Sequence, residues 1–237
     1  MDRDTVALLP TGSCEQHGPH LPLLTDTLLA SAVAREVEKR LPLDILLLPT
    51  IWLGASTHHM AFDGTIDGSF AAYEESVLAA LTSLAHHGFH RVFVLNGHGG
   101  NTSSNDTVCR RHKAANPGHV VGHSGYFAWI GADLLEQTLE GPLKTIRHAC
   151  EAEASLMLHL HPELVKMDRA RDDGLATHPP VPGLVWHFDE STEEGSHGFA
   201  TLATAAKGKA LFEASVAGVT AAMKALREGV TLRPADH

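Results

Sequence analysis

Short apolar runs alternate with longer amphipathic patterns along this chain, and that alternation constrains the fold more than any other feature. The run "RVFVLN" (91–96) is apolar almost throughout, which is typical of a strand covered on both faces. We expect strands at 5–10, 44–52, 91–96 and 119–124, and helices at 26–40, 70–87, 101–115, 149–161 and 205–228. This order predicts an α/β fold with a mostly parallel sheet and helices on both sides.

The chain is expected to form a single domain over residues 1–237. No Gly/Ser-rich linker, repeat or low-complexity run divides it, although a proline-rich stretch around 178–183 separates the last two expected helices. With 43% hydrophobic and 19% charged residues, the chain can bury a sizeable core.

The composition argues against nucleic-acid and membrane partners. The formal net charge is −10 with no basic stripe, whereas phosphate binding requires clustered Lys and Arg. The longest apolar runs are too short to span a bilayer, and the first ten residues lack the features of a secretory signal. The three cysteines (Cys14, Cys109 and Cys150) form no C-x-x-C pair, which favours a reducing compartment, so we expect a cytoplasmic protein.

Polar, histidine-bearing loops follow the first three expected strands. These loops are "GSCEQHGPH", "GASTHH" and "GHGGN", in chain order. In parallel α/β sheets the ligand site lies beyond the carboxyl ends of the strands. The three loops are therefore expected to meet at one edge of the sheet and to form a site there.

Glu15 and His17 lie two residues apart in the first of these loops. In extended chain, residues i and i+2 point the same way and lie roughly 6.5–7 Å apart. That separation suits a carboxylate and an imidazole that hold metal ions about 3.5–4 Å apart. Asp26 returns to the same edge, where its carboxylate could bridge both ions; alternatively, Asp26 caps the helix that follows.

The segment "NGHGGN" (96–101) ends a strand and opens a helix, and its glycines allow the backbone to approach a ligand closely. Its spacing fits neither a dinucleotide-binding loop nor a P-loop. A serine hydrolase can use a similar oxyanion loop, but it would also need a G-x-S-x-G elbow. The nearest match, "GHSGY" around Ser124, has Tyr126 where the last glycine belongs. The segment therefore favours a metal site that includes His98.

The helical segment "RHACEAEASLMLHL" (147–160) supplies further candidates. Glu153 shares a helical stripe with apolar residues, where a carboxylate is costly unless it is paired, protonated or bound to metal. A buried salt bridge is the alternative reading of Glu153. His148 precedes the helix and could transfer protons, because the pKa of histidine lies near neutrality; otherwise it is an ordinary histidine at a helix start.

The segments "LLPTGSCEQHGPHLPLLTD", "NGHGGN" and "HACEAEASLML" together resemble the creatininase family of metal-dependent amidohydrolases. The resemblance spans most of residues 6–160. It implies a three-layer α/β/α domain, a dinuclear metal centre and assembly into a homo-oligomer such as a hexamer. Carried over by position, Glu15, His17, Asp26 and His98 are similar to the family's metal ligands, with Asp26 bridging. His148 and Glu153 match catalytic positions.

Among the departures of the sequence from this family, two lie in loops that bear on the site. Creatininase carries "NGHYEN", whose Glu is a ligand, whereas this chain has Gly100 there, so that another carboxylate is needed. We expect Glu153 to be that ligand and Glu151 to support the site or contact the substrate. The family pattern S-x-E-H-x-x-F-P-G-T is "STHHMAFDGT" here, with His58 in place of Glu and Asp63 in place of Pro. Further residues expected to contact the substrate are His59, Asn96, Gly99 and Gly100.

The sequence thus predicts a hydrolase that cleaves an amide bond, cyclic or formyl-type, of a small molecule with a metal-bridging water as nucleophile. The ligands offered are nitrogen and oxygen, so two ions of zinc, manganese or iron(II) per chain are expected. One alternative is a dinuclear-metal hydrolase of a carbon–carbon bond in a keto-sugar or keto-inositol. An alternative of another class is a metal-binding protein without turnover.

Overall fold

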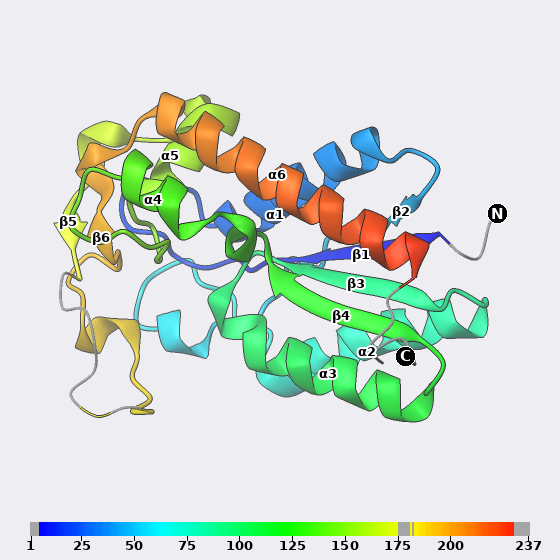
Figure 1. Cartoon of the computed structure of the whole chain (residues 1–237). Helices are drawn as coiled ribbons and strands as arrows, with labels where there is room; N and C mark the ends of the chain where they lie inside the picture. Colours follow the sequence, from blue (N-terminus) through cyan, green and yellow to red (C-terminus); the bar gives the residue numbers. More distant parts are fainter. Residues whose placement is uncertain (1–4, 175–180, 182, 230–237) are drawn as a thin grey trace.

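The computed structural model describes residues 5–174, 181 and 183–229, and its centre is a four-stranded sheet (Figure 1). The strands are β1 (Val6–Thr11), β2 (Ile45–Leu47), β3 (Arg91–Asn96) and β4 (Val120–Gly125). They lie in the order β2-β1-β3-β4, and each neighbouring pair is parallel. The predicted α/β fold with a mostly parallel sheet is therefore confirmed.

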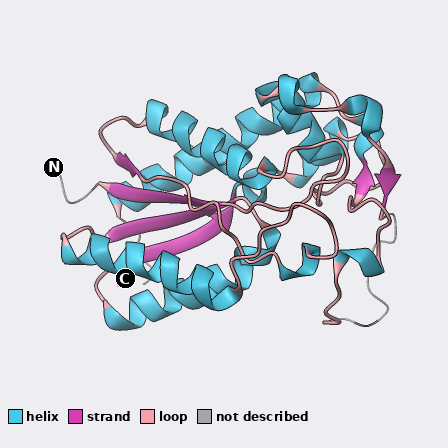
Figure 2. Ribbon diagram, turned by 180° about the vertical axis from the view of Figure 1, so that it is seen from behind, coloured by secondary structure: helices cyan, strands magenta, loops and turns pink. Residues whose placement is uncertain are grey.

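Helices cover both faces of the sheet, which gives the three expected layers (Figures 1 and 2). One face is covered by α1 (Thr25–Arg40), α4 (Ala132–Thr138), α5 (Glu151–Leu160) and α6 (Ala205–Glu228). The other face is covered by α2 (Phe70–His86) and α3 (Thr102–Ala115). Five of these helices were predicted within two residues at each end, and the seven-residue α4 was missed.

Two apolar cores lie on opposite faces of the sheet, because successive strand residues point to opposite faces. In β1, Leu8 packs into the core beneath α1, α5 and α6, while Leu9 packs into the core against α2 and α3. All six residues of β1 are buried. Coverage on both faces explains why the central strands are continuously apolar in sequence.

Strand β2 is shorter than the predicted strand over 44–52. The regular strand ends at Leu47, although the N–H of Leu48 still donates to the carbonyl of Leu8 at 3.0 Å. Pro49 has no N–H to donate, so the ladder is interrupted there, and only an isolated bridge joins Thr11 to Ile51 beyond it. The prediction was therefore wrong in extent.

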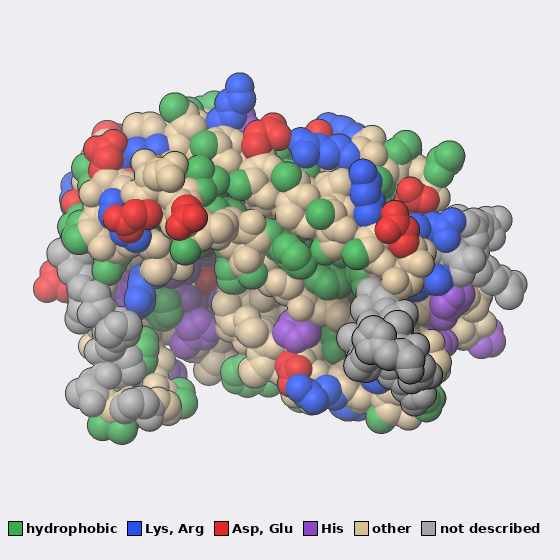
Figure 3. Space-filling model, in the orientation of Figure 1, with side chains coloured by type: hydrophobic (Ala, Val, Ile, Leu, Met, Phe, Trp, Pro, Cys, Tyr) green, Lys and Arg blue, Asp and Glu red, His purple; other side chains and the backbone are tan. Residues whose placement is uncertain are grey.

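The carboxyl ends of the strands point toward the end of the molecule that carries a small antiparallel pair, β5 (Asp172–Asp173) and β6 (Gly198–Phe199) (Figure 1). Neither short strand was predicted. Most of the proline-rich stretch 178–183 lies outside the described residues. Figure 3 shows charged side chains of both signs scattered over one face, and histidine side chains inside a hollow at this same end. Within the ranges that the structure describes, no helix has the length and apolar character needed to cross a bilayer.

Candidate metal centre

The four predicted ligands Glu15, His17, Asp26 and His98 come together at the carboxyl end of the sheet. Glu15 and His17 lie in the loop after β1, Asp26 lies in the first turn of α1, and His98 follows β3. All four are at most 3% exposed. Such burial of two carboxylates and two imidazoles excludes a solvated surface loop, and it requires that their charges be compensated inside the protein.

Asp26 lies between the two histidines, with one carboxylate oxygen toward each. Its Oδ1 is 3.0 Å from Nε2 of His17, and its Oδ2 is 3.0 Å from Nδ1 of His98. The hydroxyl of Ser13 donates to Oδ2 at 2.7 Å and fixes the carboxylate plane. The N-cap position of α1 is occupied by Leu24, so the carboxylate of Asp26 does not cap the helix. Two oxygens directed at two separate nitrogen donors are what a bridging carboxylate would present to two cations.

Glu15 is fully buried, and neither of its carboxylate oxygens accepts a hydrogen bond from a described residue. Three imidazoles surround its Oε1: Nδ1 of His98 and Nε2 of His59 each lie at 3.2 Å, and Nδ1 of His148 lies at 3.5 Å. Buried carboxylates are normally hydrogen-bonded or bound to a cation. The orphaned oxygens of Glu15 therefore fit a metal-binding role.

Backbone carbonyl groups fix the orientation of three imidazoles. Nδ1 of His17 lies 3.1 Å from the carbonyl of Glu15, and Nε2 of His98 lies 3.0 Å from the carbonyl of Ala55. Nε2 of His148 lies 2.8 Å from the carbonyl of Gln16. When the imidazole is neutral, a hydrogen bond donated by one ring nitrogen to a carbonyl leaves the other nitrogen unprotonated, so that it can act as a ligand or base. The remaining nitrogen of each ring faces the carboxylates.

The protonation states of the metal-free site follow from this geometry. Burial alone would lower the pKa of His17, but the Asp26 carboxylate outweighs it and raises the pKa to about 9. Similarly, Glu15 and Asp26 overcome the effect of burial and raise the pKa of His98 well above its ordinary value. Protons on these two histidines then balance the two carboxylates, in the role that cations would otherwise fill.

His148 behaves in the opposite way. Burial and the positive charge of His17 hold the pKa of His148 well below its usual range. Its imidazole is therefore neutral near pH 7, with Nδ1 available to accept a proton beside Glu15.

Glu153 and Glu151 have different surroundings, although both lie in the first turn of α5 and both are buried. Glu153 faces the cluster of Glu15, His17, Asp26 and His98, and one of its oxygens lies within 4.8 Å of a nitrogen of His17 and a nitrogen of His148. Its Oε2 accepts a hydrogen bond from the N–H of Ala149 at 2.5 Å. Burial raises the pKa of Glu153 to about 8. A cation close to this carboxylate would keep it ionised.

Glu151 points away from the cluster. Its two oxygens accept from the N–H groups of Glu140 and Gly141 at 2.9 and 3.0 Å, and Nζ of Lys207 donates to Oε1 at 2.7 Å. This carboxylate thus joins α5 to α6 and to the loop after α4. Of the two glutamates, only Glu153 lines the cavity described below.

The residues of the "NGHGGN" segment divide between the cavity and its support. Gly99 and Gly100 line the cavity, as does His59. Asn96 does not; its Oδ1 accepts from the N–H of His98 at 3.1 Å and from the hydroxyl of Thr11 at 3.1 Å. Asn96 therefore holds the loop that positions His98, and it does not line the cavity in which we expected it to contact the substrate.

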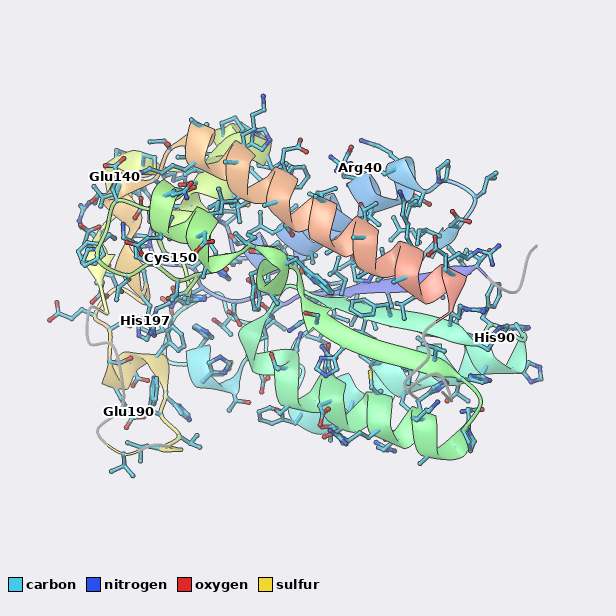
Figure 4. The ribbon with its side chains drawn as sticks, viewed as in Figure 1. Arg40, His90, Glu140, Cys150, Glu190 and His197 are labelled. Atoms are coloured by element: carbon cyan, nitrogen blue, oxygen red, sulfur yellow. The ribbon has the colours of Figure 1, made fainter. Side chains whose placement is uncertain are left out.

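A cavity of about 350 Å³ opens next to this cluster. Several of its walls were not among the predicted site residues: Phe127, Ile146, Arg147, Phe188 and His197, together with His58, which the sequence marked only as a departure from the family pattern. Figure 4 shows His197 and Cys150 at this end of the molecule, with His90 at the opposite end. Ser124, the nucleophile of the serine-hydrolase alternative, does not line the cavity, and its hydroxyl donates to the carbonyl of Gly125 at 3.3 Å. That alternative has no support in the site.

Comparison with known proteins agrees with this arrangement. The sequence model of the creatininase family, described as creatinine amidohydrolase, matches residues 1–223. The chain belongs to the creatininase family. This is a family of metal-dependent amidohydrolases, and the sequence resemblance that predicted it is confirmed.

Two curated relatives of this creatininase-family protein bear different names. The mycofactocin precursor peptide peptidase of Mycobacterium tuberculosis is 36% identical over 222 residues, which cover 88% of this chain and 80% of the relative. The creatinine amidohydrolase of Pseudomonas putida is 31% identical over 235 residues, covering 93% and 89%. One relative is thus named for a peptide and the other for a small cyclic molecule.

Solved structures support the fold. A Bacteroides fragilis structure described as a proposed creatinine amidohydrolase has a TM-score of 0.86 at 25% identity and covers 98% of this chain and 93% of its own. A creatininase structure described as a zinc–zinc form has a TM-score of 0.81 at 31% identity. Another, described as a manganese form, has a TM-score of 0.82 at 30% identity. Each match covers 93% of this chain and 90% of the other. Metal-bound relatives therefore share the scaffold that carries this cluster.

Proposed function

We propose that this protein is a dinuclear metal hydrolase that cleaves an amide bond, cyclic or formyl-type, of a small molecule. The observation that carries the proposal is the position of Asp26, with one oxygen 3.0 Å from His17 and the other 3.0 Å from His98, beside the orphaned carboxylate of Glu15. We assign five metal ligands: Glu15, His17, Asp26, His98 and Glu153. Asp26 is assigned as the ligand that bridges the two ions.

The residues fit two divalent ions of zinc, manganese or iron(II). All the donors are imidazole nitrogens or carboxylate oxygens, which these ions accept. The three cysteines are buried without disulfides, and none belongs to a cluster of candidate ligands among the described residues. When bound, two such ions lower the pKa of a water molecule and polarise the carbonyl group of a substrate.

His148 is assigned the proton transfer. Its Nε2 is held by the carbonyl of Gln16, so the unprotonated Nδ1 is directed toward Glu15 Oε1 at 3.5 Å. A neutral imidazole in this position can accept the proton that the nucleophile loses, and it can then donate it to the leaving nitrogen. Because amide nitrogen is a poor leaving group until it is protonated, this second step favours cleavage.

The cavity suits a small substrate rather than a folded protein, since its volume of about 350 Å³ is at the lower end of the range for small-molecule sites. Phe127, Ile146 and Phe188 offer apolar walls, and His59, Gly99 and Gly100 also line the cavity. These last three are our candidates for substrate contact. For Glu151 and Asn96, which were also predicted to contact the substrate, we propose instead a supporting role for α5 and for the His98 loop, on the basis of their hydrogen bonds.

A peptide substrate, the two alternative functions, the cellular location and the oligomeric state remain predictions. The end of a peptide could enter this cavity, as the name of the mycobacterial relative would require. The carbon–carbon hydrolase and the metal-binding protein without turnover are distinguished from the proposed function by substrate screening. We also predict a cytoplasmic homo-oligomer, such as a hexamer, without nucleic-acid or membrane partners.

Elemental analysis and a substrate panel test the proposal. Protein purified by gel filtration from a metal-replete preparation should hold about two divalent ions per chain, as two-metal sites do. It should hydrolyse at least one cyclic amide or formamide in a panel that also contains short peptides, and His148→Ala should lose turnover while keeping its metal. A metal content near zero would refute the dinuclear centre. Two ions with activity only on keto-sugars or keto-inositols, or with no activity, would refute the amide assignment.

A further inference from the structure

Gly100 has no side chain beside His98, and the ring of His58 lies in the space that such a side chain would use. A Cβ atom at residue 100 would lie 2.4 Å from Nε2 of His98 and 2.6 Å from Cε1 of His58. Both distances are well below ordinary van der Waals contact. Gly100 supplies no ligand, and a histidine from another loop takes its place next to the cluster.

Hydrogen bonds to Asp67 fix the turn that carries His58. The N–H of Ser56 and the hydroxyl of Thr57 donate to the two oxygens of Asp67, each at 2.8 Å. These bonds begin the short 3-10 turn Thr57–His59 and hold it against the cavity. The backbone of His58 is thus anchored on the side away from the cluster.

The ring of His58 is held by its neighbours. It stacks on the ring of His98, with 5.5 Å between centroids and 15° between planes. It also contacts Phe188, another residue that lines the cavity, at a centroid distance of 5.6 Å. The imidazole is therefore positioned at the cavity without any bound ligand.

The nitrogen atoms of His58 are available. Whereas His17, His98 and His148 each use one ring nitrogen on a backbone carbonyl, His58 forms no hydrogen bond within the described part of the chain. One of its nitrogens, an oxygen of Glu15 and a nitrogen of His98 all lie within 4.8 Å of one another. Two imidazoles and a carboxylate at this separation can converge on one ion.

We propose that His58 is a metal ligand, which together with Glu15 and His98 binds one of the two ions. This inference rests on the proposed function only because it needs a metal at the cluster; it does not depend on which bond is cleaved. A histidine ligand in place of a glutamate also affects which metal ion the site prefers. Imidazole nitrogen suits zinc, whereas carboxylate oxygen suits manganese. A histidine at position 58 therefore favours zinc over manganese at this ion.

Ring-for-ring substitution provides the sharpest test. His58→Phe keeps a planar ring against Phe188 but removes both nitrogens. His197→Phe is the matched control, because His197 lines the same cavity and stacks on Phe188 at 4.8 Å, yet belongs to no cluster of candidate ligands among the described residues. His58→Glu restores a ligand of the other type. Zinc and manganese binding is measured by titration with a competing chelator, and the cobalt(II)-substituted proteins are compared by visible absorption.

We expect wild type and His197→Phe to hold two zinc ions, and His58→Phe to bind one of them about 100-fold more weakly, at the upper end of the loss seen when a supporting residue of a metal site is removed. His58→Glu should hold two ions, with the ratio of zinc to manganese affinity shifted toward manganese and an altered cobalt spectrum. Two ions in His58→Phe with unchanged zinc affinity and cobalt spectrum would overturn the inference.

Two results separate this inference from the proposed function. If wild type holds two ions but cleaves no amide, the proposed function fails while the comparison of His58 variants still decides the ligand. If wild type holds no metal, both fail. Should His58→Phe not fold, His58→Gln and His58→Glu, which have nearly the same shape, give the same comparison: retention of both ions by the glutamine variant would overturn the inference.

Discussion

Replacing Gly100 with alanine is expected to damage the metal centre through a single methyl group. The added Cβ would lie 2.4 Å from Nε2 of His98, 2.6 Å from Cε1 of His58 and 2.7 Å from the carbonyl oxygen of Ala55. Favourable contacts between heavy atoms begin at about 3.5 Å, so each neighbour would have to retreat by about 1 Å. Gly100 is not among the glycines with positive φ, so the expected effect comes from packing and not from backbone strain.

The clash bears on the hydrogen bond that orients His98. Nε2 of His98 is held 3.0 Å from the carbonyl of Ala55, and the new methyl group would press on both atoms of this pair. Overpacking of this kind costs about 1–3 kcal/mol, which for a chain of this length corresponds to a fall in Tm of about 2–12 °C. Loss of the orienting bond should weaken metal binding by about 10–100-fold.

Gly99→Ala is the matched control, because a Cβ atom at residue 99 would meet nothing within 4 Å. Both variants are compared with wild type by scanning calorimetry and by elemental analysis after gel filtration. Gly99→Ala should retain the metal content and Tm of wild type, whereas Gly100→Ala should lose metal and melt earlier. If Gly100→Ala holds two ions and has the same Tm as Gly99→Ala, the space beside His98 is not as tight as the structure indicates. That result would refute the prediction.

Asp26→Asn should lose metal and activity together, because a neutral amide cannot bridge two cations; retention of both ions, measured by elemental analysis, would contradict the bridging role. Glu153→Gln should lower the metal content, whereas Glu151→Gln should keep the metal and lose about 1–3 kcal/mol in urea unfolding, since two buried backbone N–H groups and a lysine would lose their charged acceptor. The reverse pattern would exchange the roles of the two glutamates. Removal of metal with a chelator should lower the Tm, and the free energy of unfolding of the metal-free protein should then fall as pH rises from about 6.5 to about 9. The reason is that the folded-state pKa values of His17 and Glu153 are raised, to about 9 and about 8, so that the stability they contribute when protonated is lost on deprotonation. A flat pH profile in urea unfolding would argue against this protonation scheme.

The sequence was sufficient for the parts of the site that follow from topology. Glu15, His17 and His98 come directly after central strands, and parallel strands present their carboxyl ends at one edge, so their meeting could be predicted without coordinates. Glu153 could also be placed, because a carboxylate on an apolar helical stripe must point into the core. The positions of these residues follow from the periodicity of apolar residues in each element and from the direction of the strands, both of which can be read from short segments of the sequence.

Other parts depend on how distant side chains meet, and no local pattern encodes that. The position of His58 becomes meaningful only once Gly100, over forty residues away, is seen to leave space for it. Phe188 and His197 come from a segment without periodicity that folds back over the cavity. Asn96 was expected in contact with the substrate, but a side-chain amide can turn either way, and here it hydrogen-bonds to its own loop.

Three walls of the cavity come from stretches of chain that carry none of the assigned metal ligands, which allows substrate choice to diverge while the reaction centre is retained. Phe127 lies in a 3-10 turn after β4, and Phe188 and His197 lie in the segment that leads to β6; among the described residues, none of these three belongs to a cluster of candidate ligands. Exchange of Phe127 or His197 would reshape the chamber with little effect on the metal ligands, whereas exchange of Phe188 would also disturb His58, His59 and His148, which it contacts. Arg147 is different, because it immediately precedes His148, and insertions there would disturb the proton-transferring group. Libraries built to alter selectivity should therefore vary Phe127 and His197 and leave Phe188 and residues 146–153 intact.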